Sequence, residues 1–451
     1  MASKNEFGTK IGLIAATVGS AVGLGNIWRF PAETQANGGS AFLLVYVLCT
    51  LVLGIPVMLA EFSLGRGGRS DAIGVFHKLS PGSKWWIAGA LAVLASYLIL
   101  CYYMVVTGWT FEYLCQSLTG GLFDAPDITA QNTFVEKMDV YVGSDVRPLL
   151  FTWLVIILNG VVLLGGVQKG IEKLSNVLMP LLFIILVALC CVTLSLPDAD
   201  KGVSYFLTPD FSKITPRVLI SGLGQAFFSL SLGMGVLITY ASYYPADTKL
   251  ARTSVVVVIS SIVVAVLMGL VIFPAVTSFG LDKESLAGAT LVFVTLPEVF
   301  ARLPLPQLWS SLFFILLFVA ALTSTVSIAE VTVAMLQDRF GMSRRGATIA
   351  ALLPLMFLSG LCSLSFGSLS DFKIFGMTIF SLFDNFTTDV LLPVVSLGVC
   401  LYMGWKAPKG LLDSELSNKG TIRSRTSGIV EGIIRYVAPL LIALILVFNF
   451  I

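Results

Sequence analysis

The sequence predicts an all-α membrane protein with eleven transmembrane helices, arranged as two inverted repeats of five helices each and one further helix. Of the 451 residues, 56% are hydrophobic and only 12% are charged, far too apolar for a soluble multidomain protein. Apolar runs of about 20 residues, the length that crosses a bilayer, recur along the whole chain. The first and the sixth run are interrupted by glycines, which indicates a repeat built around broken helices.

The eleven apolar runs are each expected to form one spanning helix. They cover residues 10–36, 40–64, 86–118, 148–166, 171–195, 217–242, 251–280, 307–337, 346–364, 372–402 and 432–451. Residues 1–195, with helices one to five, form the expected first repeat, and residues 196–403, with helices six to ten, form the second. Residues 404–451 hold a cytoplasmic loop and the eleventh helix.

The loops predict the orientation in the membrane. With the N-terminus inside, 19 of the 28 Lys and Arg residues lie on the cytoplasmic side and eight lie outside, while Arg29 falls within the first run. Cytoplasmic loops of membrane proteins carry this excess of positive charge. An odd number of spans then places the C-terminus outside. The prolines within residues 281–306 predict short helical pieces in that outer loop.

The first run cannot be an ordinary spanning helix. Residues 19–31 read Gly-Ser-Ala-Val-Gly-Leu-Gly-Asn-Ile-Trp-Arg-Phe-Pro, which places three glycines, an asparagine and an arginine inside an apolar segment. Each glycine weakens a helix by about 1 kcal/mol relative to alanine, and an arginine at membrane depth is costly. Both are tolerated where the backbone lines a polar cavity, so a binding site is expected near the middle of the bilayer.

The sixth run is interrupted in a similar way. Gly222-Leu-Gly-Gln225 leads to Phe228-Ser-Leu-Ser-Leu-Gly233-Met-Gly235. Two such helices at corresponding positions of two five-helix halves indicate a transporter whose broken helices meet at one site. The N-terminal ends of half-helices attract an anionic group and their C-terminal ends attract cations, so an amino acid zwitterion suits both.

Composition and charge argue against several other classes of function. A net charge of +2 gives no reason to expect nucleic acid as a partner. The only histidine, His77, lies in a cytoplasmic loop without a metal-ligand cluster or a phosphate-binding loop, which argues against an enzyme. No obligate protein partner is evident. The apolar composition requires a lipid bilayer around the protein.

Several motifs together resemble the neurotransmitter:sodium symporter family. They are residues 19–31, Asn37-Gly-Gly-Ser-Ala-Phe42, Gly54-Ile-Pro-Val-Met-Leu-Ala-Glu61, Tyr102-Tyr103, residues 225–235 and Ala320-Ala-Leu-Thr-Ser324. The resemblance is specific, because the motifs follow one another in the family's order over nearly the whole chain. Within the family, the chain is most similar to a bacterial transporter of several hydrophobic amino acids. The resemblance implies the leucine-transporter fold and sodium-driven symport.

The resemblance implies two sodium sites built from oxygen ligands, as a hard cation requires. The first site lies against the substrate carboxylate, and its expected ligands are Ala21, Asn26, Ser229 and Ser261, the last in place of the family's usual asparagine. The second site takes the carbonyls of Gly19, Val22 and Ala320 and the hydroxyls of Thr323 and Ser324. The alternative for these two hydroxyls is that they bond back to the carbonyls of their own helix.

Chloride dependence stays open. Tyr46, Gln225, Ser229 and Ser261 would surround an anion in this family. The deciding position, which holds a carboxylate in chloride-independent relatives and a serine in chloride-dependent ones, is Ala265.

The resemblance also implies the substrate class. Gly23 stands where monoamine transporters have an aspartate, so the substrate has to supply its own carboxylate, and this favours an α-amino acid. The expected ligands of its polar groups are Leu24, Gly25 and Tyr103 for the carboxylate, and Ala21, Phe228, Ser229 and Ser231 for the ammonium group. The expected side-chain subsite consists of Ile99, Tyr103, Phe228, Met234, Ser324 and Ile328.

This subsite predicts a broad range of hydrophobic substrates, from valine and leucine to phenylalanine and tryptophan. It is mostly apolar and carries no charge. Met234 stands where the leucine transporter has a phenylalanine, and an unbranched thioether adapts to side chains of different size. The alternative for Met234 is plain filling of the core.

Two ion pairs resemble the family's gates. Arg29 and Asp371, the latter at the expected start of the tenth span, would close the outer side above Phe228 and Tyr103. The alternative for Asp371 is a group that caps a helix N-terminus. Lys4 and Asp338 would form the inner pair.

The expected function is sodium-coupled import of hydrophobic L-amino acids by alternating access, in the cytoplasmic membrane of a bacterium. A sodium symporter of the same fold for another small solute, or a sodium-dependent amino acid sensor, is the alternative.

Overall fold

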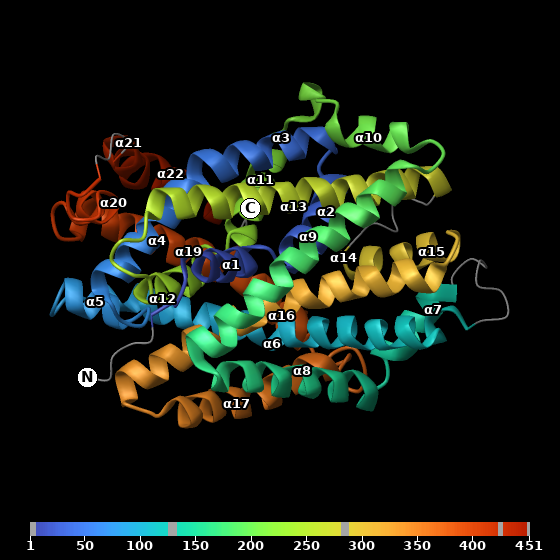
Figure 1. The fold of residues 1–451 in the computed structure, drawn as a ribbon, viewed down its shortest axis with the longest axis horizontal. Coiled ribbons are helices and arrows are strands. Elements are labelled where there is room, and N and C mark those ends of the chain that lie inside the picture. Colours follow the sequence, from blue (N-terminus) through green and yellow to red (C-terminus); the bar gives the residue numbers. More distant parts are fainter. Residues whose placement is uncertain (1–5, 125–132, 281–287, 423–426, 449–451) are drawn as a thin grey trace.

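The computed structural model describes residues 6–124, 133–280, 288–422 and 427–448. Within these ranges the regular secondary structure is helical, apart from one isolated bridge between Ile374 and Met377, and the helices are joined by turns and irregular segments. The long helices run along the long axis of the molecule, and α5 and α20 lie at the left of Figure 1. All helices belong to one packed bundle.

The first part of the chain contains the helices α1 to α9. Their bounds are α1 Lys10–Ala21, α2 Phe30–Ala36, α3 Ser40–Cys49, α4 Ile55–Gly68, α5 Gly74–Leu79, α6 Trp86–Thr119, α7 Thr133–Val142, α8 Val146–Leu164 and α9 Lys173–Leu194. Short 3-10 turns cover Gly121–Phe123 and, after α10, Phe211–Lys213.

The second part contains α10 to α22. Their bounds are α10 Ala199–Leu207, α11 Pro216–Ser229, α12 Val236–Ser242, α13 Leu250–Phe279, α14 Gly288–Thr290, α15 Leu296–Ala301, α16 Pro306–Phe340, α17 Arg344–Leu364, α18 Ile379–Asn385, α19 Leu392–Leu401, α20 Leu411–Leu416, α21 Ser427–Gly432 and α22 Ala438–Phe448.

Several of the spanning helices contain a π-helical turn. These turns are Gly25–Arg29, Thr50–Gly54, Val167–Glu172, Phe386–Leu391, Tyr402–Lys406 and Ile433–Val437, and a further one, Leu291–Thr295, lies between α14 and α15. Thr50–Gly54, Phe386–Leu391 and Ile433–Val437 each join two α-helical segments of one continuous span, whereas Val167–Glu172 begins a span and Tyr402–Lys406 ends one. In the first span the π-helical turn Gly25–Arg29 follows a bend, at which α1 and residues 25–36 meet at an angle of 48°.

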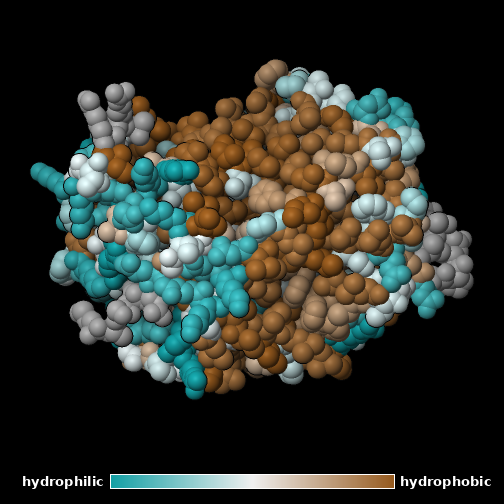
Figure 2. All heavy atoms as spheres, viewed as in Figure 1, coloured by the Kyte–Doolittle hydropathy of each residue, from teal (hydrophilic) through white to brown (hydrophobic). Residues whose placement is uncertain are grey.

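The described residues are consistent with the predicted spans, although the count of eleven stays a prediction. Nine continuous helices are long and apolar enough to cross a membrane, and the bent pair of residues 10–21 and 25–36 adds a tenth. The remaining expected span corresponds to the pair α11 and α12, interrupted at residues 230–235. Hydrophobic residues cover the middle of the face in Figure 2, and hydrophilic residues gather toward its left end, as expected for a protein whose helices cross a bilayer.

The break in the sixth span has a direct cause in its sequence. Ser231, Gly233 and Gly235 adopt φ angles of 56°, 76° and 70°, which is the left-handed region that an α-helix does not use. A side chain at Gly233 would also lie 2.6 Å from the carbonyl oxygen of Leu392, so only glycine fits there. The backbone groups of this segment are thereby released from helical hydrogen bonding.

The two broken spans lie inside the bundle. α1 packs against α16, α9 and α13, while α12 packs against α4 and α16. Glu61 of α4 supports the second break, because its carboxylate oxygen accepts a hydrogen bond of 2.8 Å from the Gly233 N–H. This carboxylate is completely buried. The intact helices therefore form a scaffold that holds the two breaks next to each other.

The loop before α16 is confirmed to contain short helical pieces. α14, the turn Leu291–Thr295 and α15 follow one another, and Pro297 lies at the start of α15. One expected boundary is wrong: the tenth span begins at Ile379 rather than at residue 372. Residues 365–378 instead form turns and the isolated bridge. Phe372 and Phe375 made this segment look membrane-embedded, yet they are 54% and 90% exposed.

Candidate substrate and sodium sites

A small cavity lies between the two helix breaks. Its volume is about 20 Å³, and it is lined by Ser20, Ala21, Gly23, Gly25, Ile99, Tyr103, Phe228, Ser229, Ser231, Met234, Ser324 and Ile328. Ten of the eleven residues expected to bind substrate are among these. The eleventh, Leu24, lies directly beside them, because its N–H donates a hydrogen bond of 2.9 Å to the Tyr103 hydroxyl.

Hydrogen bonds fix the two breaks against each other around the cavity. The Ser231 hydroxyl, in the second break, donates a bond of 2.8 Å to the Ser20 carbonyl in α1. The Gln225 amide donates a bond of 2.8 Å to the carbonyl of Gly25 in the first break. Both bonds join residues about 200 positions apart in the sequence. The cavity walls are thus held by the polar groups that the interrupted helices expose.

Gly23 forms the tightest part of the wall. A Cβ atom at this position would lie 2.4 Å from the Ser324 hydroxyl and 2.8 Å from the Tyr103 hydroxyl. The space beside residue 23 is therefore taken by two polar groups from α16 and α6, and no side chain fits there.

The residues expected at the first sodium site form a buried polar cluster. The Asn26 amide nitrogen lies 3.3 Å from the Ala21 carbonyl and 3.0 Å from the Ser261 hydroxyl. The Ser229 hydroxyl lies 3.1 Å from the hydroxyl of Tyr46. Among the described residues, the side-chain oxygen of Asn26 is buried without a hydrogen-bond partner. A buried acceptor without a donor is costly, unless a cation or a water supplies the missing interaction.

The residues expected at the second sodium site lie where α1 crosses α16. The Ser324 hydroxyl donates a bond of 3.3 Å to the Gly19 carbonyl, and a Cβ at Gly19 would lie 3.3 Å from the Thr323 Cβ. The Thr323 hydroxyl lies 3.1 Å from the carbonyls of both Val319 and Ala320. Thr323 therefore bonds back to its own helix, as the alternative predicts, while Ser324 reaches across to α1. Val22 is buried at the end of α1.

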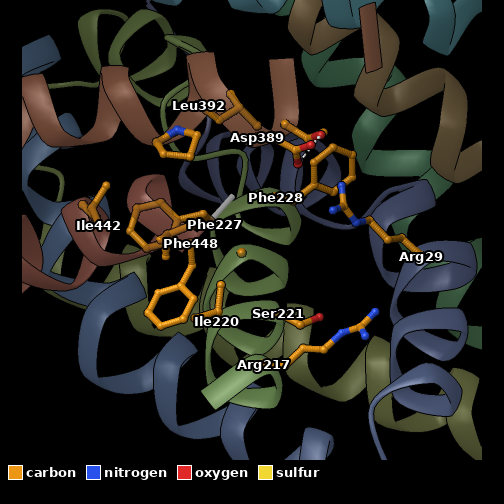
Figure 3. A pocket seen from close by; sticks show the side chains of 14 residues that line it. Arg29, Arg217, Ile220, Ser221, Phe227, Phe228, Asp389, Leu392, Ile442 and Phe448 are labelled. Atoms are coloured by element: carbon orange, nitrogen blue, oxygen red, sulfur yellow. Dashed lines mark hydrogen bonds between the residues drawn. The ribbon is translucent and has the colours of Figure 1, made fainter. Parts of the chain in front are cut away.

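Two wider clefts lie on one side of the cavity. One, of about 400 Å³, shares Gly25, Tyr103 and Phe228 with the cavity, so these residues form the wall between them. The other, of about 470 Å³, is shown in Figure 3, where the Arg29 guanidinium lies beside the Phe228 ring. The guanidinium carbon is 4.7 Å from the ring centroid, within the range of a cation–π interaction. Arg29 and Phe228 together cover the cavity.

The carboxylate opposite Arg29 is not Asp371. Asp371 is exposed and lies in the turns before α18, because the tenth span begins later than expected. Asp384 of α18 and Asp389 line the same 400 Å³ cleft as Arg29, and Asp384 interacts electrostatically with the guanidinium. On its own helix, Arg29 also lies 3.8 Å from the Glu33 carboxylate. Asp384 and Asp389, and not Asp371, are thus the acidic residues that share this cleft with Arg29.

Asp384→Asn is expected to lower transport by at least about fivefold, because it removes about 1 kcal/mol of charge interaction with Arg29. Asp371→Asn is the matched control and is expected to leave transport unchanged, because Asp371 is exposed outside the span. The measurement is the initial rate of substrate uptake into vesicles at equal amounts of folded protein. Equal rates for Asp384→Asn and the unchanged protein would contradict this assignment.

The expected inner pair is described only in part. Lys4 lies outside the described residues. Asp338, near the end of α16, accepts a hydrogen bond of 2.8 Å from the Asp71 N–H. The pairing of Lys4 with Asp338 stays a prediction.

The sequence reasoning missed two kinds of residue. Ser20 lines the cavity and its carbonyl holds Ser231, yet nothing in its type marks it, since the role belongs to the backbone. Asp384 carried a usable signal: it lies within an apolar run, where an ionisable group is expected to be functional. The same argument had singled out Arg29.

Comparison with known proteins identifies the family of the chain. The sequence model of the Sodium:neurotransmitter symporter family matches residues 4–137 and 138–451. The chain belongs to this family. Members of the Sodium:neurotransmitter symporter family are transporters rather than enzymes, and sodium use and a location in the membrane follow from membership.

Relatives in the Sodium:neurotransmitter symporter family match almost the full length. The uncharacterized sodium-dependent transporter YhdH of Bacillus subtilis is 37% identical over 444 residues, covering 98% of this chain and 96% of its own. An uncharacterized sodium-dependent transporter of Haemophilus influenzae is 35% identical, covering 99% and 98%. The crystal structure of MhsT in complex with L-phenylalanine superposes with a TM-score of 0.91 at 38% identity, covering 99% of this chain and 100% of that chain. The fold is therefore that of this family.

Proposed function

We propose that this sodium-dependent transporter imports hydrophobic L-amino acids, from aliphatic ones to tryptophan, together with sodium. The observation that carries the proposal is the cavity between the two breaks. It combines exposed backbone groups for a zwitterion with a side-chain wall of Ile99, Phe228, Met234 and Ile328 that holds no charge. MhsT, whose structure this chain resembles, was crystallised with L-phenylalanine, and this supports the same substrate class here.

The position of Gly23 supports an amino acid over an amine. Because residue 23 carries no carboxylate and its space is filled by hydroxyls, a cation at the neighbouring Asn26 cluster needs a carboxylate from the substrate. The Leu24 and Gly25 N–H groups and the Tyr103 hydroxyl are the proposed partners of that carboxylate. Substrate and sodium then stabilise each other in the site.

We assign two sodium ions to the two polar clusters. The first ion takes Ala21, Asn26, Ser229 and Ser261, and the buried Asn26 oxygen without a partner supports this assignment. The second takes Gly19, Val22, Ala320, Thr323 and Ser324, in which the Ser324 hydroxyl already bridges α16 to α1. Binding of sodium would hold α1 against α16, so that ion occupancy is coupled to the position of the broken helix.

The small volume of the cavity bears on the substrate range. About 20 Å³ accommodates roughly one water molecule, so an amino acid side chain enters only if lining side chains move. Met234 is the most flexible member of the wall. The unbranched thioether of Met234 changes shape at low energetic cost, which supports a range that extends to tryptophan.

The transport cycle is proposed to be alternating access with the N-terminus in the cytoplasm and the C-terminus outside. The excess of Lys and Arg in the loops on the N-terminal side supports this orientation. The 400 Å³ cleft above Phe228 and Tyr103 is then the outer vestibule. In the described conformation these two side chains separate the vestibule from the cavity.

Uptake into proteoliposomes tests the proposal. Radiolabelled leucine and tryptophan are supplied with an inward sodium gradient or with potassium, using the unchanged protein, Asn26→Ala and Thr323→Ala. Thr325→Ala is the matched control, because among the described residues its hydroxyl bonds only to the Leu322 carbonyl of its own helix. Sodium-dependent accumulation that is lost in the first two variants and kept in the control is the expected result.

Other outcomes of this experiment favour the alternatives. Sodium binding without accumulation of either amino acid, and with accumulation of another solute, would identify a carrier of the same fold with a different substrate. Saturable binding of leucine without any accumulation would favour a sensor. Either result overturns the proposed substrate or the proposed symport.

Met234→Phe is expected to narrow the substrate range. The rigid ring overfills a cavity that is already tight, at a cost of about 1–3 kcal/mol for the largest substrate, so tryptophan uptake should fall about tenfold or more while valine uptake changes little. Met234→Leu preserves the volume and is expected to retain tryptophan uptake. Competition of each amino acid against labelled leucine measures the range. Unchanged tryptophan competition in Met234→Phe would mean that Met234 only fills the core.

A further inference from the structure

A separate cleft lies at the end of the molecule where α1 begins. Its volume is about 320 Å³, and it is lined by Lys10, Ile11, Leu13, Ile14, Asp247, Thr248, Lys249, Arg252 and Thr253. These residues come from the first turns of α1, the loop after α12 and the first turn of α13. None of them lines the cavity between the helix breaks or the two outer clefts. The cleft is therefore a distinct site.

The charge of this cleft is positive. Lys10 forms an ion pair of 2.8 Å with Asp247, and the hydrogen bond from Lys10 holds the pKa of that carboxyl below its usual range. Asp247 thus stays ionised and balances Lys10. Among the described residues, Lys249 and Arg252 have no ion-pair partner, and both are exposed. Two cationic side chains remain available to an anionic ligand.

An apolar stripe continues from these cations along α13. Val255, Ile259 and Val263 follow Arg252 at spacings of 3, 7 and 11 residues, which places them on one face of the helix. Their side chains are 45%, 45% and 40% exposed. Ile11, in the wall of the cleft, is 76% exposed. Lys249 and Arg252 therefore lie at one end of this exposed apolar stripe.

We propose that this cleft binds an anionic phospholipid. The phosphate of its headgroup contacts Lys249 and Arg252, and one acyl chain lies along Val255, Ile259 and Val263. Charge complementarity selects an anionic headgroup over a zwitterionic one, since each Lys or Arg near an anionic lipid surface adds to the attraction. The continuous apolar stripe selects a lipid over a soluble phosphate, because only a lipid buries that surface.

Such a lipid would contact the first residues of α1 as well as α13. α1 and α13 pack against each other, and the Lys10 to Asp247 ion pair joins the start of α1 to the loop before α13. A lipid in the cleft adds a third connection between these elements. In the orientation proposed above, it comes from the cytoplasmic leaflet.

Lipid binding to the full-length protein tests the proposal. The detergent-solubilised protein is titrated with phosphatidylglycerol, and bound lipid is counted by native mass spectrometry. The variant Lys249→Gln with Arg252→Gln is expected to weaken the tightest binding step about 25-fold, or about fivefold for each cation removed. The matched control is Lys406→Gln with Lys409→Gln, two exposed cations at the end of another span and just after it, and it is expected to bind as the unchanged protein does. Equal thermal unfolding of all three proteins verifies that they are folded.

Two further measurements distinguish binding of a lipid from binding of a free phosphate. Glycerol phosphate, a soluble headgroup analogue, is expected to bind at least about tenfold more weakly than the lipid, and Ile259→Asn should weaken the lipid but not this analogue. Equal binding of the analogue and the lipid would identify a site for free anions and overturn the proposal. It also fails if phosphatidylcholine binds as tightly as phosphatidylglycerol, or if both double variants lose affinity equally.

Discussion

Gly23→Ala is expected to abolish most transport, with uptake about 10- to 100-fold below that of the unchanged protein. The added methyl group would lie 2.4 Å from the Ser324 hydroxyl and 2.8 Å from the Tyr103 hydroxyl. Neither neighbour moves freely, because Ser324 is bonded to the Gly19 carbonyl and Tyr103 to the Leu24 N–H. Overfilling a site of this kind costs about 1–3 kcal/mol, and the expected loss corresponds to about 1.4–2.8 kcal/mol, within that range. Sodium-driven leucine uptake measures it.

The control for this substitution is Gly224→Ala in α11. A Cβ at Gly224 would meet no atom within 4 Å, so the variant should transport normally. Thermal unfolding of both variants separates a blocked site from a misfolded protein. Leucine uptake by Gly23→Ala within twofold of the unchanged protein would mean that the wall at residue 23 does not limit substrate binding.

Gly65→Ala is expected to have the largest effect on stability. A Cβ at Gly65 of α4 would lie 2.1 Å from the Ile238 carbonyl oxygen and 2.9 Å from the Ala241 Cβ, both in α12. These atoms belong to the backbone or to a one-carbon side chain, so α12 itself would have to move. The cost of overpacking, about 1–3 kcal/mol or more, exceeds the gain of about 1 kcal/mol from replacing glycine in a helix. A lower midpoint of thermal unfolding and less folded protein are expected.

Gly67→Ala in the same helix provides the matched comparison. The nearest atom to a Cβ there is a terminal carbon of Leu411, at 2.9 Å, and this flexible side chain can turn away. Alanine at residue 67 increases the helix propensity of α4 as much as alanine at residue 65 does, but it displaces no neighbouring backbone. An unfolding midpoint of Gly65→Ala equal to that of Gly67→Ala would show that α4 and α12 separate easily.

The spans and the two breaks were predictable because their causes are local. Apolar length determines a span, and clustered glycines at residues 19–25 and 222–235 weaken a helix wherever they occur. The start of the tenth span was not predictable in this way. Phe372 and Phe375 are as hydrophobic as residues that lie within a membrane span, yet they lie exposed in turns. Hydrophobicity alone does not distinguish the two situations.

The candidate site was predictable only through the family's motifs. The Asn26 to Ser261 and Ser324 to Gly19 contacts join residues 235 and 305 positions apart, and no helical periodicity relates them. The motifs supplied those pairings. They did not lead to the acidic residues beside Arg29, because the span boundary expected at residue 372 pointed to Asp371 instead. Asp384 became evident only when the cleft around Arg29 was known.

A π-helical turn within a spanning helix changes how the helical segments before and after it are rotated relative to each other. A π-helical turn accommodates one residue more than the α-helical turn it replaces, so it absorbs a single inserted residue without breaking the helix. Removing one residue from Thr50–Gly54 would restore a regular α-helix there and rotate α3 relative to α4 by about 100°. α3 faces α11 and α4 faces α12, the two halves of the sixth span. The turn Thr50–Gly54 therefore determines the rotation of α3 relative to α4 about the helix axis. This rotation lets one spanning helix pack against both α11 and α12.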